Sequence, residues 1–338
     1  MASIEGDVRY VLILHEPQRR APRNVSIKER SMKREYQPML ATLVDQPFDS
    51  KDWVYETKWD GFRLVAEVRR DSVRLFSRNG IEVTARYPGI AQALRAITEP
   101  CVIDGELVAL DAKGRSRFQL LQNALRDAST KLRYCVFDVL FLGGKDMRRK
   151  PLLERKALLK QVLPRNSLLR YSKHIKVKGT ALFKKAKQAG LEGVMAKRAA
   201  GLYYSGKRTR EWLKFKAMNE QEVVIVGYTA PRRSRKYFGA LVLAVRTGSN
   251  WRYVGHAGTG FDEEMLRSLY EKMQPLKTQA KPFNVQVKDE AHTTWLRPRL
   301  VGEVKFTEWT ASGEMRHPVF LGIRSDKKAT DVIREMPA

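Results

Sequence analysis

Residues 55–63 read Tyr55-Glu56-Thr57-Lys58-Trp59-Asp60-Gly61-Phe62-Arg63. Lys58 follows a strand-like run and stands at an Asp-Gly turn, and Arg63 lies on the strand that comes next. A lysine with a pKa of about 10.4 is a poor nucleophile at neutral pH, but nearby cations such as Lys214, Lys216 and a bound metal would favour its neutral form. The stretch therefore predicts a reactive lysine that forms a covalent intermediate.

Further short strings follow Lys58 along the chain, and their order strengthens this prediction. One lysine among 64 basic residues is by itself most simply surface charge, just as Asp60 alone could cap a turn and Arg63 could lie on the surface. The strings are Ser77-Arg78-Asn79-Gly80, Asp104-Gly105-Glu106, Phe137-Asp138, Glu192-Gly193-Val194-Met195-Ala196-Lys197 and Trp212-Leu213-Lys214-Phe215-Lys216. Together they favour a catalytic site.

This series resembles the motifs of the covalent nucleotidyltransferases, the superfamily of ATP-dependent DNA ligases, RNA ligases and mRNA capping enzymes, which begins with Lys-x-Asp-Gly. The segment from Glu308-Trp309-Thr310 through Arg316-His317-Pro318 to Arg324-Ser325-Asp326-Lys327 is similar to the OB-domain motif of the ligase module of bacterial non-homologous end-joining ligases. Pro38-Met39-Leu40-Ala41 is also similar to that module. The resemblance covers roughly residues 36–335 and is specific to the superfamily.

The charge of the chain indicates a polyanionic partner. Lysine and arginine total 64 against 37 aspartate and glutamate residues, which gives a net charge of +27 and a pI near 10.2. No apolar run approaches the ~18 residues of a membrane-spanning helix, and no signal peptide is visible. We therefore expect a DNA-binding protein without a membrane partner, located in the bacterial cytoplasm with the nucleoid.

The two cysteines, Cys101 and Cys135, each stand in an apolar strand-like run. This placement is typical of reduced, buried thiols and argues against a disulfide framework or a zinc cluster.

The chain of 338 residues is longer than a single hydrophobic core usually supports, so two domains are expected. In residues 36–218, strand-like and helical patterns alternate without a regular βαβ repeat, which predicts an α+β adenylation (nucleotidyltransferase) domain built on antiparallel sheets. The expected strands are 64–68, 73–77, 101–110 and 134–142, and the expected helices are 86–97, 152–162 and 180–189.

The polar, helix-ambiguous residues 217–221 mark the expected domain boundary. Strand-like runs at 223–228, 238–245, 251–254, 300–306 and 319–323, with one amphipathic helix at 261–273, predict that residues 219–338 form an OB-fold β-barrel. Residues 1–35 form a basic arm, which either adds a phosphate contact or is a solvated tail.

The resemblance implies a role for each motif residue. Lys58 attacks the α-phosphorus of ATP, Glu56 and Thr57 lie along the edge of the adenine ring, and Asp60 orients the lysine. Arg78 and Glu106 meet the ribose, and Phe137 stacks on the base, although on its own it would read equally well as a core residue. Arg63 contacts AMP or the phosphate at the nick.

The same resemblance implies how phosphate charge is neutralised. Glu106 and Glu192 hold Mg²⁺ or Mn²⁺, and Lys197, Lys214 and Lys216 contact the α-phosphate. Arg324, Asp326 and Lys327 come from the second domain and stabilise the leaving pyrophosphate when the two domains close. His317 is expected to be structural.

These observations predict an ATP-dependent DNA ligase that joins nicked or broken double-stranded DNA in repair and recombination, acting as a monomer. A Ku-like end-bridging partner is suggested by analogy with the end-joining ligases. An RNA ligase or an mRNA capping guanylyltransferase would use the same lysine chemistry, and the side chains alone do not separate ATP from GTP. A non-catalytic DNA-binding module would explain the charge but not the motif series.

Overall fold

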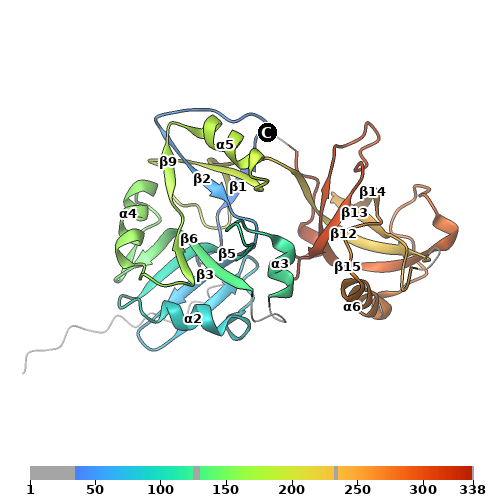
Figure 1. Cartoon of the computed structure of the whole chain (residues 1–338), viewed down its shortest axis with the longest axis horizontal. Coiled ribbons are helices and arrows are strands. Elements are labelled where there is room, and N and C mark those ends of the chain that lie inside the picture. The colour runs from blue at the N-terminus through green and yellow to red at the C-terminus, as the bar shows by residue number, and fades with distance from the viewer. Residues whose placement is uncertain (1–34, 125–129, 232–234, 337–338) are drawn as a thin grey trace, which may run out of the picture. The chain divides into compact units, whose positions relative to one another are not determined.

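The computed structural model describes residues 35–124, 130–231 and 235–336 (Figure 1). The predicted basic arm, residues 1–35, lies outside these ranges except for its last residue. Within the described residues, no helix is both long and apolar enough to cross a membrane.

The first sheet carries Lys58 at the end of one of its strands. It has the order β1-β11-β10-β2-β9, antiparallel except for the β1–β11 pair. Its strands are β1 (Leu40–Leu43), β2 (Trp53–Lys58), β9 (His174–Lys176), β10 (Gly193–Arg198) and β11 (Arg208–Lys216), and α5 (Gly179–Gln188) packs against it. Tyr55, Val194 and Phe215 are buried in its core, so β2, β10 and β11 are fixed relative to one another.

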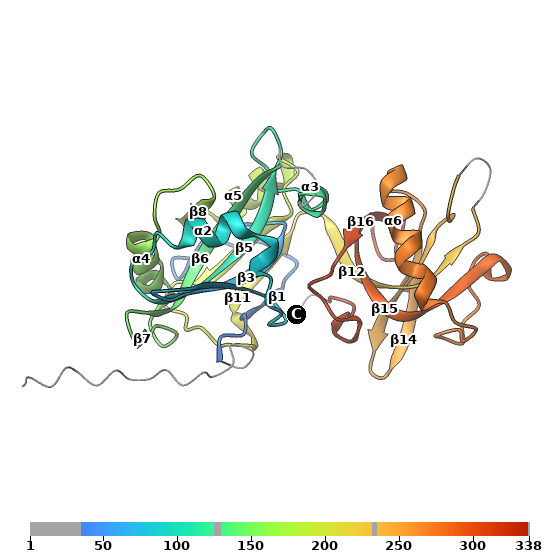
Figure 2. The same ribbon diagram turned by 90° about the horizontal axis from the view of Figure 1, so that it is seen from below.

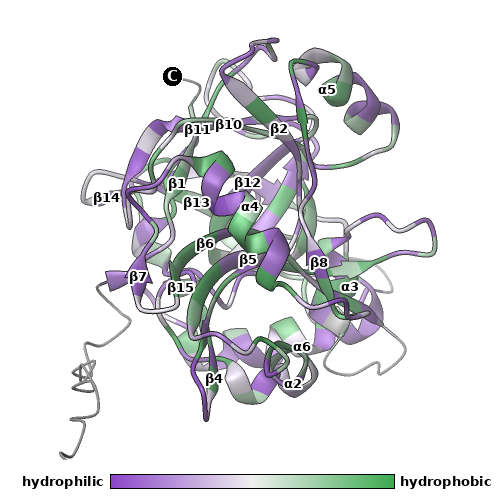
Figure 3. Ribbon diagram, turned by 90° about the vertical axis from the view of Figure 1, so that its left-hand side faces the viewer, coloured by the Kyte–Doolittle hydropathy of each residue, from purple (hydrophilic) through white to green (hydrophobic). Residues whose placement is uncertain are grey.

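The second sheet packs against the first. It has the order β4-β3-β5-β6-β7, with β8 added beside β6 in parallel. Its strands are β3 (Phe62–Val68), β4 (Val73–Ser77), β5 (Cys101–Leu110), β6 (Lys131–Leu142), β7 (Lys145–Asp146) and β8 (Leu169–Tyr171), and its helices are α2 (Pro88–Leu94), α3 (Phe118–Asn123) and α4 (Leu152–Val162). Figure 3 shows β5 and β6 as mostly hydrophobic strands, as expected of strands buried on both faces.

Successive side chains of β3 point to opposite faces of the second sheet, and this explains how the two sheets pack. Leu64 and Ala66 join a core cluster that includes residues of α2 and α4, whereas Val65 faces a separate cluster with Phe137 and Trp212, which joins the two sheets. Each face of the second sheet therefore buries a different set of side chains.

The third sheet is the predicted OB-fold β-barrel (Figure 2). Its order is β14-β13-β12-β15-β16, all antiparallel, with β12 (Asn219–Thr229), β13 (Leu241–Thr247), β14 (Asn250–Ala257), β15 (Thr293–Phe306) and β16 (Val319–Ile323). The two outer strands of this sheet, β14 and β16, come together where the Phe320 amide of β16 donates a hydrogen bond of 2.9 Å to the carbonyl of Thr259, just after β14. Helix α6 (Glu263–Met273) contributes Leu269 and Met273 to the core.

The short 3₁₀ helices are Thr84–Arg86, Gln274–Leu276, Glu290–His292 and Ala329–Asp331. The first of them shortens a predicted element: the helix expected at 86–97 runs from Pro88 to Leu94, because the chain forms a 3₁₀ turn before Pro88 opens α2. The α+β class and the antiparallel sheets are confirmed. Cys101 and Cys135 are free and buried, and burial raises the pKa of each thiol to about 12.

The polar stretch 217–221, where the domain boundary is expected, lies mostly within a strand. Ala217 and Met218 alone separate β11 from β12, and Asn219 already pairs with Phe306 in the barrel. Glu220 and Gln221 are polar in sequence, but both are buried within β12. The division at residue 218 stays a prediction.

Candidate functional site

A cavity of about 490 Å³ brings the predicted site residues together. Its wall includes residues of β2, β3, β5, β6, β10 and β11 and of the segment after β16. The predicted residues in the wall are Glu56, Thr57, Lys58, Asp60, Arg63, Arg78, Glu106, Phe137, Glu192, Lys197, Lys214, Lys216, Arg324 and Lys327. Asp326 is not among the lining residues.

Lys58 stands at the last position of β2, opposite Gly193 of β10. Its Nζ donates a hydrogen bond to Glu192 Oε1, and these two groups also form an ion pair. Gly193 has φ of 154°, and a Cβ there would collide with the Phe215 carbonyl, so the close packing of β10 on β11 at this point requires glycine. The backbone thus fixes the positions from which Lys58 and Glu192 meet.

Carboxylates set the charge state of Lys58 in this arrangement. Burial lowers the pKa of Lys58, but the Glu192 carboxylate more than offsets burial and holds that pKa above its usual value. Glu220 and Asp60 act in the same direction, which favours the ammonium form. The expectation that neighbouring cations, including a bound metal, favour a neutral lysine stays a prediction.

Glu56 is buried and its carboxylate is fully bound. Lys156 donates to Oε1 at 2.7 Å, and Ser172 and Lys197 each reach Oε2 at 3.1 Å. Burial alone would raise the pKa of Glu56, but the two lysines keep it below its usual value. Lys156 and Ser172 were missed, because Lys156 lies in an ordinary helical pattern and Ser172 in a short strand-end segment.

Phe137 lies in the cavity wall but is 7% exposed. Lys197 Nζ lies 4.1 Å from the centre of its ring, and the Arg63 guanidinium carbon lies 4.7 Å from it. Trp212 contacts the ring edge-on at 5.8 Å between centroids. Phe137 is therefore both a core residue and a lining residue, and stacking on a base stays a prediction.

Arg63 uses its forked donors within the protein. Its Nε and Nη2 donate to the two carboxylate oxygens of Asp104 at 2.5 and 2.6 Å, and the Tyr203 hydroxyl donates to the same carboxylate at 2.6 Å. Arg63 thus ties β3 to β5, and its predicted contact with AMP or a nick phosphate is not tested.

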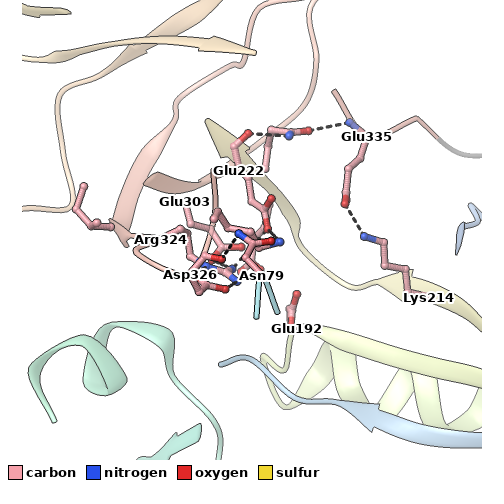
Figure 4. Close-up of polar contacts among 12 residues, drawn as sticks. Asn79, Glu192, Lys214, Glu222, Glu303, Arg324, Asp326 and Glu335 are labelled. Atoms are coloured by element: carbon pink, nitrogen blue, oxygen red, sulfur yellow. Dashed lines mark hydrogen bonds and ion pairs between the residues drawn. The ribbon is translucent and has the colours of Figure 1, made fainter. Parts of the chain in front are cut away.

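The three predicted phosphate-binding lysines fall into two groups. Lys197 contacts Glu56, and burial lowers its pKa to about 8. Lys214 and Lys216 instead face Glu335, a carboxylate that the motifs do not include, and each donates a hydrogen bond of 2.6 Å to it. Figure 4 shows the contact with Lys214. Burial lowers the pKa of Lys214 to about 8, whereas the Glu335 charge outweighs burial at Lys216 and raises its pKa.

A cluster of carboxylates lies next to Lys58. One oxygen from each of Asp60, Glu192 and Glu220 lies within 4.8 Å of the others, and Glu220 Oε2 has no hydrogen-bond partner among the described residues. Burial, followed by the charge of Glu192, raises the pKa of Glu220 to about 9. Glu220 was not predicted as a site residue, since it stands in the polar stretch that marks the expected domain boundary. Burial also raises the pKa of Glu106, the other predicted metal ligand, to about 7.

The barrel residues of the predicted pyrophosphate site pair with one another. Arg324 donates to both Asp326 oxygens at 2.9 Å and to Glu303 at 2.8 Å. Lys327 Nζ lies 2.5 Å from Glu222. Asp326 is therefore bound to Arg324, which lines the cavity, and its expected role at the pyrophosphate stays a prediction. Figure 4 shows this cluster.

Arg78 and its neighbour Asn79 belong to the second sheet's side of the site. The Asn79 side chain donates to the Asp326 carbonyl at 2.7 Å, and Arg78 lines the cavity. The charge of Arg78 contributes to lowering the pKa of Glu222 and of Lys327, which places it near both groups.

Two family models match the chain. A model described as ATP dependent DNA ligase domain matches residues 38–216, and a model described as ATP dependent DNA ligase C terminal region matches residues 234–327.

Two curated relatives have similar sequences over most of this chain. The multifunctional non-homologous end joining protein LigD of Pseudomonas aeruginosa is 37% identical over 310 residues, covering 89% of this chain and 37% of that protein. The multifunctional non-homologous end joining DNA repair protein LigD of Mycobacterium tuberculosis is 37% identical over 307 residues, covering 88% of this chain and 40% of that protein. The chain thus spans less than half the length of these relatives.

A solved structure has the same fold over most of the chain. The mycobacterial DNA ligase D complexed with ATP and MES matches with a TM-score of 0.68 at 35% identity, covering 89% of this chain and 98% of that one.

Proposed function

We propose that this chain, which belongs to the ATP-dependent DNA ligase family, uses ATP to seal nicks and broken ends in duplex DNA. The observation that carries the proposal is the place of Lys58. The end of β2 holds it in a cavity whose wall also contains Lys214, Arg324 and Lys327, which suit a nucleoside triphosphate.

In the first step, Lys58 gives up a proton to solvent and leaves its ion pair with Glu192. Its Nζ then attacks the α-phosphorus of ATP, a nitrogen–phosphorus bond forms, and the bond to the bridging oxygen breaks, so that pyrophosphate leaves and the nitrogen releases a second proton to solvent. Lys214 and Lys216 neutralise the α-phosphate. Arg324 and Lys327, from the barrel, neutralise the pyrophosphate, and Asp326 positions Arg324.

The residues beside Lys58 fit a divalent cation. Asp60, Glu192 and Glu220 offer clustered oxygens, and the unpartnered Glu220 Oε2 is buried where a carboxylate needs a partner. Glu192 is common to this cluster and to the predicted Glu106–Glu192 pair. When bound, Mg²⁺ or Mn²⁺ would supply positive charge beside the phosphate oxygens and compete with Lys58 for Glu192.

The base and sugar of ATP would occupy the side of the cavity opposite the barrel cations. Glu56 and Thr57 would edge the adenine and Phe137 would pack against it, since all three line the cavity. Arg78 and Glu106 would contact the ribose, and Lys197 would lie between the base side and the phosphates. Arg63 would act mainly by holding Asp104 in place.

In the second step, an oxygen of the DNA 5′-phosphate attacks the phosphorus of Lys58-AMP, and the nitrogen–phosphorus bond breaks. In the third step, the DNA 3′-hydroxyl attacks the 5′-phosphate, a phosphodiester forms, and AMP leaves. The basic character of the chain, with a net charge of +27, favours binding to the duplex in both steps.

The cellular setting follows from the relatives by analogy. Their names describe non-homologous end joining, so we propose that broken ends as well as nicks are substrates and that the protein acts in DNA repair and recombination. A Ku-like end-bridging partner, a monomeric state, and a place in the bacterial cytoplasm with the nucleoid belong to the same proposal.

Sealing of a 5′-phosphorylated nicked duplex with ATP and Mg²⁺ tests the proposal. We expect joined product from the native chain and from Lys184→Ala, which removes an exposed lysine of α5, and none from Lys58→Ala. Label transfer from GTP without joining of DNA would instead favour a capping guanylyltransferase, and joining of RNA alone would favour an RNA ligase. Neither label nor joining would favour a DNA-binding module.

A further inference from the structure

The Glu335 carboxylate bridges the two lysines that the proposed mechanism assigns to the α-phosphate. One oxygen accepts from Lys214 and the other from Lys216, each at 2.6 Å. Glu335 lies outside the motif series and follows the last predicted site residue, Lys327, by eight positions. It lines the same cavity as Lys58.

The segment that carries Glu335 is held in place by the barrel. Val332 is 1% exposed in the barrel core, and its carbonyl accepts from the Arg246 amide at 2.7 Å. The Gln221 side chain then clamps the segment on both sides, donating to the Ile333 carbonyl at 3.0 Å and accepting from the Glu335 amide at 3.1 Å. Figure 4 shows the resulting side chain directed at Lys214. The contact is therefore built into the fold.

The chemistry of the bridge matches that of a phosphate. Two oxygens of one anion each face one ammonium group, as two oxygens of a phosphate would. The two lysines keep the pKa of Glu335 well below its usual value although burial opposes this, so the carboxylate is charged at neutral pH. The lysine side chains are only 13% and 15% exposed, and the Nζ of each forms an ion pair with Glu335. A phosphate cannot bind both lysines in this way while Glu335 does.

We propose that Glu335 is an internal competitor for the phosphate-binding lysines: it holds Lys214 and Lys216 until a substrate phosphate displaces it. This rests on the proposed function in which those lysines contact the α-phosphate. The binding of ATP then releases residues 333–336 from the lysines, which links occupation of the site to the position of this segment.

The competition is measured by the ATP concentration that gives half the maximal rate of Lys58-AMP formation, with α-labelled ATP. In Glu335→Gln this concentration falls about fivefold, because a neutral amide binds the ammonium groups more weakly. Glu263→Gln is the matched control: it also removes one negative charge from the barrel domain, but its side chain is 75% exposed on α6 and pairs with Lys236. We expect no change in this control.

A double-mutant comparison separates competition from a general charge effect. In a chain with Lys214→Met, which keeps Lys216, Glu335→Gln lowers the half-saturating ATP concentration less than it does in the native chain, because one of the two partners of Glu335 is gone. An unchanged or higher half-saturating ATP concentration in Glu335→Gln alone overturns the proposal, and a higher one would make Glu335 a residue that positions the lysines for ATP.

A second measurement keeps this inference separate from the proposed function. If no chain forms a labelled adduct, the ligase proposal fails, and inorganic phosphate, which can bridge Lys214 and Lys216 as Glu335 does, is used as the probe in thermal unfolding. A larger rise in melting temperature with phosphate for Glu335→Gln than for the native chain and Glu263→Gln supports competition at the lysines. An equal rise in all three overturns it.

Discussion

The two sides of the cavity hold their charges in different ways. On the side proposed for the base, Glu56 is buried and bound on both oxygens by Lys156, Ser172 and Lys197. On the side proposed for the phosphates, the cations contact protein carboxylates that a substrate phosphate or a divalent cation would displace. These contacts are Lys58–Glu192, Lys214–Glu335, Lys216–Glu335, Arg324–Glu303 and Lys327–Glu222.

The difference separates a preorganised side from an exchangeable one. The ion-paired side chains of the Glu56 network are at most 2% exposed, and both Glu56 oxygens are hydrogen-bonded, so the network fixes the shape of the base side before nucleotide binds. The phosphate side must keep several cations close together without substrate, and the carboxylates offset their mutual repulsion. Substitutions on the two sides should therefore affect different properties.

The largest expected effect is on the exchangeable side. Glu192→Gln keeps a hydrogen-bond acceptor for Lys58 but removes a charged oxygen from the Asp60–Glu192–Glu220 cluster, so we expect Lys58-AMP formation to slow by about 100-fold or more. The rate is measured from α-labelled ATP, with Glu154→Gln, an exposed acid on α4, as the control. A faster reaction would mean that Glu192 merely restrains Lys58, and would contradict its role beside the phosphates.

The second largest effect is expected for a substitution on the preorganised side, and it changes the stability of the fold. Lys156→Met leaves Glu56 Oε1 buried without its main partner, so we expect the free energy of unfolding to fall by about 3 kcal/mol. Urea unfolding of this variant is compared with that of Lys160→Met, which changes an exposed lysine of the same helix. Combining Lys156→Met with Glu56→Gln should recover part of the loss, and a loss equal to that of Lys160→Met would show that the network is not preorganised.

The smallest effect concerns pH. Burial lowers the pKa of Lys197 from 10.5 to about 8, so between these values the unfolded chain binds a proton at this residue that the folded chain does not. Stability from this residue therefore rises with pH across that window, by at most about 1.4 kcal/mol per pH unit. As the pH rises above 8, the native chain should gain unfolding free energy relative to Lys197→Met. A difference between the two chains that is constant with pH would contradict the lowered pKa of Lys197.

The motif series contains most of the residues that line the cavity. Lys58, Glu192 and Lys216 are far apart in sequence, but strands pair in register, so β2, β10 and β11 bring them together. Position within a motif is in this case a good guide to position in the fold.

The residues that sequence reasoning missed share a physical reason. Lys156, Glu220 and Glu335 are charged residues in segments that look solvated, and their places depend on contacts between elements distant in sequence. Lys156 and Glu220 are buried, and Glu335 is half-buried. For the same reason composition showed the excess of lysines around Lys58, but not that the Glu192 carboxylate contacts it.

The most direct test of the account is to find where AMP becomes attached. The native chain is incubated with ATP and Mg²⁺, digested, and its peptides are examined by mass spectrometry, beside Lys58→Arg as a variant that keeps the positive charge. The account predicts one AMP group on the peptide that contains Lys58 in the native chain and none in the variant. AMP on a different lysine, or equal labelling of both chains, would contradict it.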